Sequence, residues 1–249
     1  SYEGEKERLI MKEFNISDGW YWFLLAAAVC YLIGCFNFAV LISHFKKKDI
    51  REVGSGNPGT MNMTRTFGMK VGAVNFFLDL IKGGVPALAG YLIFKDYVFA
   101  GTDILVADFA RYFFGVFVII GHIFPVFMKF KGGKGIASTF GVFVFALSCE
   151  NWWYFFILVV ACFTILGYIA LTEWGSMGSL LGVAGFTVWQ AAIFVLRYSN
   201  NLLQGGVIAI FGLLLLINLL TWIAHHKNIY RLLAGEERRT RVIKRKNKI

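Results

Sequence analysis

The sequence predicts an all-α integral membrane protein, with about seven transmembrane helices and short or re-entrant helices around a site on the cytoplasmic side. Three observations predict this class. Of 249 residues, 57% are hydrophobic and only 16% are charged, and the mean hydropathy is +0.63, which is too apolar for an ordinary soluble domain. The apolar residues form long runs rather than the ten-residue alternating segments of a barrel. The basic residues gather in short loops and in the tail, so the net charge of +10 indicates membrane topology before it indicates nucleic acid.

Seven apolar runs are candidates for these helices. They cover about residues 20–44, 71–94, 109–127, 134–149, 152–171, 180–196 and 203–224. A run of roughly 20 apolar residues crosses a bilayer. The fourth run is shorter, so we expect it to begin inside the protein at membrane depth, where irregular backbone must line a cavity or be covered.

The second run contains two charged residues, Asp79 and Lys82. They are three residues apart and therefore share one face of a helix. Charges at this depth are costly. The pair either neutralises itself inside the helix bundle or borders a polar site, and the sequence favours neither interpretation over the other.

The distribution of Lys and Arg predicts the orientation. Eighteen of them lie on the side that includes the C-terminus, and six lie on the other side. The positive-inside rule then places the N-terminus outside and the C-terminus with the glycine-rich motifs in the cytoplasm, in a multi-pass protein of the cell membrane. We divide the chain into a polar N-terminal segment outside the core fold (1–19), a seven-helix membrane domain (20–226) and a basic cytoplasmic tail (227–249).

A polar, glycine-rich stretch at residues 53–65 follows the first apolar run. Gly54 and Gly56 allow the backbone to approach a ligand closely and to turn its N–H groups inward. Further donors come from the side chains of Ser55, Asn57, Asn62, Thr64 and Arg65. A helix that begins after Pro58 would add unpaired N–H groups. The stretch is typical of a phosphate site, although a solvated turn between two membrane helices would have the same composition.

A second stretch, residues 121–135, also combines glycines with lysines, including Lys131 and Lys134. Two further polar stretches, at residues 176–179 and 225–228, also lie at the predicted cytoplasmic ends of their runs, so all four can converge. Together they offer many cations and almost no acids, which suits phosphate groups. Neither His122 nor His225 has an obvious Asp partner in sequence, and a serine such as Ser55 in a glycine loop is more often a phosphate donor than a nucleophile. The sequence shows no ligand set for a metal, and we expect no cofactor.

Taken in order, these motifs resemble those of the bacterial membrane-integral acyl-phosphate:glycerol-3-phosphate acyltransferases, the PlsY family. The resemblance extends from about residue 20 to residue 237. It rests on four segments that end runs of apolar residues: G-S-G-N-P-G at 54–59, G-H at 121–122 with F-K-G-G-K-G at 130–135, S-x-x-S at 176–179, and H-x-x-N-I-x-R-L-L-x-G-x-E at 225–237.

The resemblance implies an enzyme that transfers an acyl group from acyl phosphate to the 1-hydroxyl of glycerol 3-phosphate. The products would be lysophosphatidic acid (1-acyl-glycerol 3-phosphate) and phosphate, for phospholipid biosynthesis. Catalytic roles would fall to His225, Ser55 and Asn228. Substrate and phosphate groups would be bound by Gly54, Ser55, Gly56, Asn57, Asn62, Arg65, Lys131, Lys134, Ser176 and Ser179. Membrane lipids would surround the protein, and neither nucleic acid nor an obligate protein partner is implied.

The chain departs from the family pattern at three places. The usual G-A-T-N is here Gly59 to Asn62 with the sequence G-T-M-N, the usual G-S-x-P-F is G-C-F-N-F at 34–38, and Ala224 stands where an arginine is usual. These changes affect the details of substrate binding more than the class of reaction.

Two other classes of function remain open on the sequence. The first is a transporter or channel for a phosphorylated or anionic solute, because interrupted helices with glycine-rich ends also build anion sites. The absence of a convincing internal repeat speaks against it. The second is a non-catalytic binder of anionic lipid through the basic tail, which would leave the glycine-rich stretches unexplained.

Overall fold

The computed structural model describes residues 11–237 and 239. Its elements follow the order β1 (Lys12–Phe14), α2 (Ile16–Cys35), α3 (Phe38–Phe45), α4 (Thr60–Phe67), α5 (Met69–Phe94), β2 (Tyr97–Phe99), α6 (Val106–Ile123), the 3₁₀ helix η1 (Val126–Met128), α7 (Ile136–Ser148), α8 (Tyr154–Thr172), α9 (Gly175–Arg197), α10 (Gly205–Ala224) and α11 (His226–Leu233). Within the described residues, six helical segments have the length and composition to cross a membrane, and α7 is a shorter apolar helix. The predicted all-α membrane architecture is confirmed, including the short fourth run.

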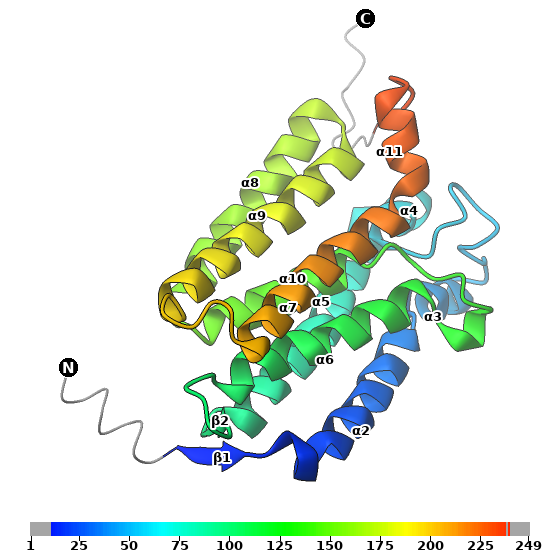
Figure 1. Ribbon diagram of the computed structural model, residues 1–249. Coiled ribbons are helices and arrows are strands. Elements are labelled where there is room, and N and C mark those ends of the chain that lie inside the picture. The colour runs from blue at the N-terminus through cyan, green and yellow to red at the C-terminus, as the bar shows by residue number, and fades with distance from the viewer. Residues whose placement is uncertain (1–10, 238, 240–249) are drawn as a thin grey trace, which may run out of the picture.

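Helix α6 forms the centre of the bundle. It packs against α2, α5, α7 and α10, and 61% of its most apolar 18-residue stretch is buried. Helix α8 is the least covered by the protein, because only 11% of the corresponding stretch is buried. Figure 1 shows α8 at the edge of the molecule, beside α9. An apolar helix that the protein leaves uncovered faces lipid in a membrane.

Small residues bring the inner helices close together. A Cβ added to Gly34 of α2 would collide with the backbone of α6, and one added to Gly83 of α5 would collide with Ser138 of α7. Gly141 of α7 is pressed against the carbonyl of Leu80 in the same way. Membrane helices gain no hydrophobic energy from packing against each other, so close backbone approach through small residues supplies their attraction.

The first predicted run, residues 20–44, is interrupted between α2 and α3. Asn37 caps α3 by accepting a hydrogen bond from the Val40 amide at 3.0 Å, and its own amide donates to the Pro58 carbonyl at 3.3 Å. The interruption also frees the Phe36 carbonyl, which accepts a hydrogen bond from Lys82 at 2.8 Å. One departure from the family pattern, asparagine where proline is usual, therefore ties this break to the glycine-rich stretch.

Described residues of both end segments take part in the fold. Within the segment 1–19, β1 pairs in parallel with β2, and Phe14 packs edge-on against Phe23 and Phe94. Helix α2 begins at Ile16, four residues before the expected start. The segment 227–249, predicted to be a basic tail, contributes most of α11. Residues 1–10, 238 and 240–249 lie outside the described residues.

The polar stretches gather at one end of the bundle. The first loop (residues 46–59) joins α3 to α4, and the second loop (residues 124–135) joins α6 to α7 through η1. Figure 1 shows α3, α4 and α11 at this end, and β1 with β2 at the opposite end. This arrangement places the predicted site residues together.

Candidate active site

Asn62 holds the first loop in shape from the first turns of α4. Its Oδ1 accepts a hydrogen bond from the Ser55 amide at 3.0 Å, and its Nδ2 donates to the carbonyls of Val53 and Ile50 at 2.9 and 3.1 Å. Gly54 has a φ of +63° and packs against the Asn62 amide, where a side chain would not fit. Asn62 is buried and its polar atoms bond to the loop, so its place in the structure is that of a support.

The second loop is folded back onto the end of α6. The amides of Gly132 and Gly133 donate to the carbonyls of Ile123 and His122 at 3.0 and 3.1 Å. A side chain at Gly132 would collide with the His122 carbonyl, and one at Gly133 would collide with the His122 ring. Gly135, at a φ of +78°, turns the chain into α7. The glycines of this loop therefore make room for α6 beneath it.

A hydrogen-bonded network joins the second loop to α9 and α11. Lys134 donates from Nζ to Oδ1 of Asn228 at 2.5 Å, and Nδ2 of Asn228 donates to the Ser176 hydroxyl at 2.6 Å. That hydroxyl donates in turn to Oε1 of Glu237 at 2.6 Å. Glu237 follows α11, so the end of the described chain closes over the site.

Burial controls the charge state of two groups here. The pKa of Lys134 falls to about 8, chiefly because burial disfavours its charge; Glu237 opposes this shift, and Arg231 and Arg65 add to it. The pKa of His225 falls to about 4 because it is buried and lies near Lys134. Its Nδ1 lies 2.8 Å from the Thr221 carbonyl, which can only accept, so the neutral ring carries its proton on Nδ1 and keeps a lone pair on Nε2.

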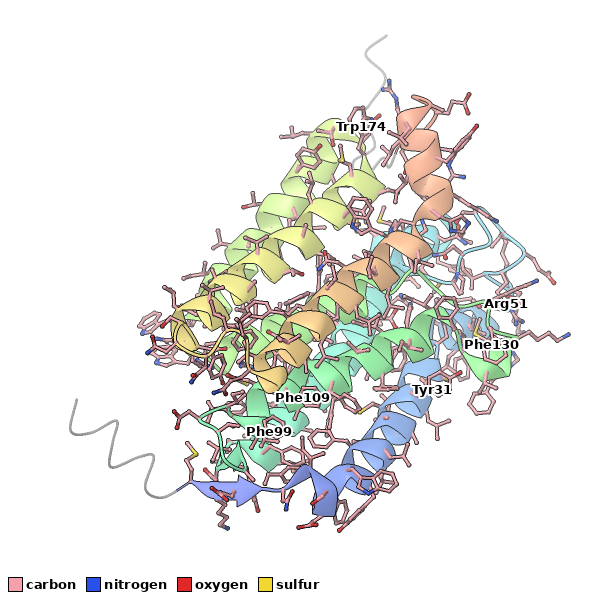
Figure 2. The ribbon with its side chains drawn as sticks, viewed as in Figure 1. Tyr31, Arg51, Phe99, Phe109, Phe130 and Trp174 are labelled. Atoms are coloured by element: carbon pink, nitrogen blue, oxygen red, sulfur yellow. The ribbon has the colours of Figure 1, made fainter. Side chains whose placement is uncertain are left out.

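These groups surround one cavity of about 840 Å³. Among the described residues, its lining has seven Lys and Arg side chains against two carboxylates, Asp79 and Glu237. The apolar part of the lining includes Phe76, Met128, Ile136, Phe140, Ile165 and Leu166. Figure 2 labels Arg51 and Phe130, one from each loop, at this end of the molecule. A cavity lined by both cationic and apolar side chains suits a ligand that has a phosphate at one end and a hydrocarbon chain at the other.

The structure brings together nearly all of the residues expected from sequence. Eleven of the twelve line the cavity, namely Ser55, Gly56, Asn57, Asn62, Arg65, Lys131, Lys134, Ser176, Ser179, His225 and Asn228. Gly54 is not part of the lining and shapes the loop instead. The ligand-binding roles of the eleven stay predictions.

Among the lining residues outside the expected set, three carry a carboxylate or an imidazole close to the site: Glu237, Asp79 and His122. Glu237 stands within a quoted motif, but an acid was not expected in a phosphate site. Asp79 and Lys82 form a buried pair at 3.1 Å, and Asp79 also borders the cavity, so both interpretations of this pair hold. His122 lies beside them. A charged pair in an apolar run, followed along the chain by Gly-His at the end of the next run, is the signal that marks this group.

The spacing His-x-x-x-x-Asp, a candidate catalytic pair, occurs once in the chain, from His44 to Asp49. Asp49 binds Arg51 instead, at 2.6 Å, and neither His44 nor Asp49 lines the cavity. Within the described residues, no hydrogen bond joins the two. The structure therefore gives them no place as a catalytic pair.

Fold and site together define a polytopic helical membrane protein with a cation-rich cavity at one end of the bundle. The described residues hold no cluster of three His, Cys, Asp or Glu side chains placed to bind a metal ion. The chain belongs to the family described as glycerol-3-phosphate acyltransferase, whose model matches residues 24–235.

Relatives and solved structures agree with this membership. The glycerol-3-phosphate acyltransferases of Pseudothermotoga lettingae and Aquifex aeolicus are each 36% identical to this chain, over 89% and 87% of it and 96% and 98% of their own lengths. Crystal structures of PlsY (YgiH), an integral membrane glycerol 3-phosphate acyltransferase, are 30% identical and cover 87% of this chain and 94% of theirs. The glycerol 3-phosphate form has a TM-score of 0.69 and the lysophosphatidic acid form one of 0.68. The resemblance to the PlsY family is confirmed.

Proposed function

We propose that the protein transfers an acyl group from acyl phosphate to the 1-hydroxyl of glycerol 3-phosphate, giving 1-acyl-glycerol 3-phosphate and phosphate as a step in phospholipid biosynthesis. The observation that carries this proposal is the cavity lined by both cationic and apolar side chains. The similar PlsY structures have a glycerol 3-phosphate form and a lysophosphatidic acid form, which correspond to the acceptor and the product proposed here.

The donor is inferred from the number of cations. Arg65 lies in α4, just after the first loop, and Lys131 and Lys134 belong to the second loop, so two separate segments bring positive charge to the cavity. One set would bind the phosphate of the acceptor and the other that of the donor. An acyl phosphate already has a good leaving group, so the protein needs to align the alcohol and neutralise the two phosphates rather than activate the acyl group.

We further infer direct attack by the glycerol hydroxyl. No histidine or carboxylate among the described residues hydrogen-bonds the Ser55 hydroxyl, so Ser55 lacks the adjacent base that a serine nucleophile needs. Ser55 would instead help to bind a phosphate, with Asn228 holding Lys134 in place. A labelled acyl group trapped on Ser55 during quenched turnover would contradict direct attack.

The proton of the hydroxyl has two candidate acceptors. His225 presents its Nε2 lone pair, but a pKa of about 4 makes it a weak base. The dianion of a phosphate monoester takes up a proton at a pKa of about 6. The departing phosphate is therefore the better acceptor, and His225 would orient the hydroxyl by accepting its hydrogen bond.

Orientation in the membrane belongs to the same proposal. The excess of basic residues at the cavity end favours a cytoplasmic site with the N-terminus outside, where a phosphorylated metabolite reaches the cavity from the cytoplasm. Cysteines introduced singly at Lys47 and Lys95, in a protein without its own cysteines, would test this. In intact cells an impermeant thiol reagent should label position 95 and leave position 47 unlabelled; the reverse pattern would contradict the proposal.

The function is tested with purified protein, palmitoyl phosphate and labelled glycerol 3-phosphate, without acyl-CoA or added divalent metal. We expect lysophosphatidic acid from the wild type and from Lys70→Ala, an exposed lysine outside the cavity lining, and very little from Arg65→Ala or Lys134→Ala. No product from folded wild type would overturn the proposal. Uptake of labelled glycerol 3-phosphate into vesicles that hold the protein, without product, would favour a transporter instead.

A further inference from the structure

Lys82 lies at the point where α2, α5 and α6 meet beneath the cavity. Its Nζ is 2.8 Å from the Phe36 carbonyl, 3.3 Å from the Gly34 carbonyl, 3.1 Å from Oδ1 of Asp79 and 2.8 Å from Nδ1 of His122. The side chains of Lys82, Asp79 and His122 are each 3 to 4% exposed. The ammonium group thus has acceptors at the end of α2, on α5 and on α6.

This arrangement fixes the tautomer of His122. An ammonium group can only donate, so Nδ1 of His122 must accept, and the proton of the neutral ring then resides on Nε2. A doubly protonated ring would direct an N–H at the ammonium hydrogens. Asp79, which is 3.7 Å from Nδ1, balances the charge of Lys82. Lys82 and Asp79 therefore turn His122 into a neutral hydrogen-bond donor at Nε2.

The Nε2 atom faces the place where the two loops meet. His122 lines the cavity, and a Cβ built at Gly133 would collide with Nε2 while also approaching the Pro58 carbonyl. Gly133 belongs to the second loop and Pro58 to the first. Across residues 11–237 and 239, no hydrogen bond within the protein engages Nε2. The donor is thus available to a ligand.

We propose that His122 donates its Nε2–H to the carbonyl oxygen of the acyl donor, and that Lys82 and Asp79 are positioning residues that hold this tautomer. This inference rests on the proposed function. As the glycerol oxygen bonds to the acyl carbon, charge collects on the carbonyl oxygen. The bond from that carbon to the phosphate oxygen then breaks, and the hydroxyl proton leaves with the phosphate. His122 keeps its own proton throughout.

The carbonyl oxygen is the better partner for two reasons. Phosphates are already served by Arg65, Lys131 and Lys134, so a neutral donor adds little there. An oxygen whose charge grows during the reaction gains most from a fixed, water-excluded donor, because the donor needs no reorganisation. The buried ring of His122, held by Lys82 from behind, has these properties.

A matched pair of variants tests the donor. In His122→Gln the amide nitrogen reaches the position of Nε2, whereas in His122→Asn the amide reaches only that of Nδ1. We expect kcat to fall by about 10²- to 10³-fold in His122→Asn and by no more than about tenfold in His122→Gln, with the KM for glycerol 3-phosphate changed less than about threefold in both. Binding of glycerol 3-phosphate, measured by calorimetry without a donor, should be nearly unchanged.

Several outcomes would overturn this assignment. His122→Asn as active as His122→Gln would show that the ring only packs against Lys82, and a loss confined to the KM for glycerol 3-phosphate would show that Nε2 binds the acceptor's phosphate. These outcomes would leave the proposed function standing. Wild type that makes no product would overturn the proposed function and this inference with it.

The positioning role has its own measurement. The chain contains four histidines, so ¹⁵N labelling of the rings, with single substitutions for assignment, can follow His122 alone. We expect wild type to show one tautomer, protonated at Nε2, and Asp79→Asn and Lys82→Met to show a mixture with reduced kcat. A variant that unfolds more readily but keeps the single tautomer and full kcat would reduce Lys82 and Asp79 to packing residues.

Discussion

Two buried polar clusters occupy opposite ends of α6 and α9, and their charges are arranged in opposite ways. At the end away from the cavity, Arg111 binds Asp108 at 2.7 Å and also Glu150, and Arg197 binds Asp108 at 2.6 Å and also Glu150. Tyr198 donates to Asp108 at 2.6 Å. Two arginines thus face two carboxylates. Although burial alone would raise the pKa of Glu150, the two arginines hold it below its usual value.

At the cavity end the positive and negative charges do not balance. Seven basic side chains border the space against the two carboxylates described there, and His122 keeps a donor with no partner in the described chain. A buried cluster whose charges cancel has no need of a ligand, and it holds helices together. A cluster with surplus cations is complete only when an anion binds. The comparison therefore separates packing from function more clearly than burial does, since residues at both ends are buried.

The largest effect is expected from breaking the balanced cluster. Arg111→Met leaves Asp108 and Glu150 with a single arginine and should lower the free energy of unfolding by about 3 to 5 kcal/mol. Thermal unfolding in detergent measures this, with Arg111→Lys as the milder control. Protein that survives purification should keep its KM for glycerol 3-phosphate. An unchanged unfolding temperature would show that the cluster does not hold α6 to α9.

The next effect concerns the cavity, where we expect a loss of activity with little loss of stability. Lys134→Met removes a cation that lines the cavity and should lower kcat/KM by about 10²- to 10³-fold, while the unfolding temperature stays within a few degrees. Lys70→Met is the matched control, because Lys70 is exposed and lies outside the lining. Steady-state kinetics in both variants provides the comparison. Equal losses of kcat/KM in Lys134→Met and Lys70→Met would show that a cation in the cavity lining matters no more than one outside it.

A third prediction uses the lowered pKa of Lys134. The free wild-type protein should lose kcat/KM above a pH of about 8, approaching about tenfold per pH unit, because Lys134 gives up the proton that makes it a cation. Arginine stays charged throughout this range. The alkaline limb should therefore move upward by at least one pH unit in Lys134→Arg, whatever its maximal rate. A limb that stays near pH 8 would assign it to another group.

The smallest effect concerns the join between the first loop and the membrane helices. Asn37→Ala removes the cap at Val40 and the hydrogen bond to Pro58, and should cost about 1 kcal/mol of stability. Because Asn37 is outside the cavity lining, kcat should change less than about twofold. Denaturant unfolding and initial rates in the same detergent provide both numbers. A larger loss of kcat than of stability would place Asn37 in the site's machinery.

Much of the cavity end could be predicted from sequence, because its signals are local. Glycines, donors and lysines stand within short stretches, and counting helices places those stretches on one side of the membrane. The role of Asn62 could not be predicted in this way. Its amide resembles a phosphate ligand in sequence, and only the fold shows that three backbone groups of the loop already engage it.

The pairing between distant residues in the balanced cluster could not be predicted. Arg111 lies 39 residues from Glu150, and Asp108 lies 89 residues from Arg197, and no pattern within one helix links them. The same holds for β1, where three residues pair with Tyr97–Phe99 across more than 80 positions of chain. Pairing over such distances depends on how helices pack, which periodicity does not encode.

The shortness of α7 bears on how substrate concentration is counted. Its 13 residues extend over about 20 Å, while the hydrocarbon core of a bilayer is roughly 30 Å thick, so α7 is too short to cross it. We expect its Gly135 end, which borders the cavity, to lie below the membrane surface. An acyl donor dissolved in the leaflet then meets the protein by lateral diffusion. The rate would follow the mole fraction of donor in the lipid, not its amount per volume of water. Adding empty lipid at a constant total amount of acyl phosphate should slow the reaction by surface dilution.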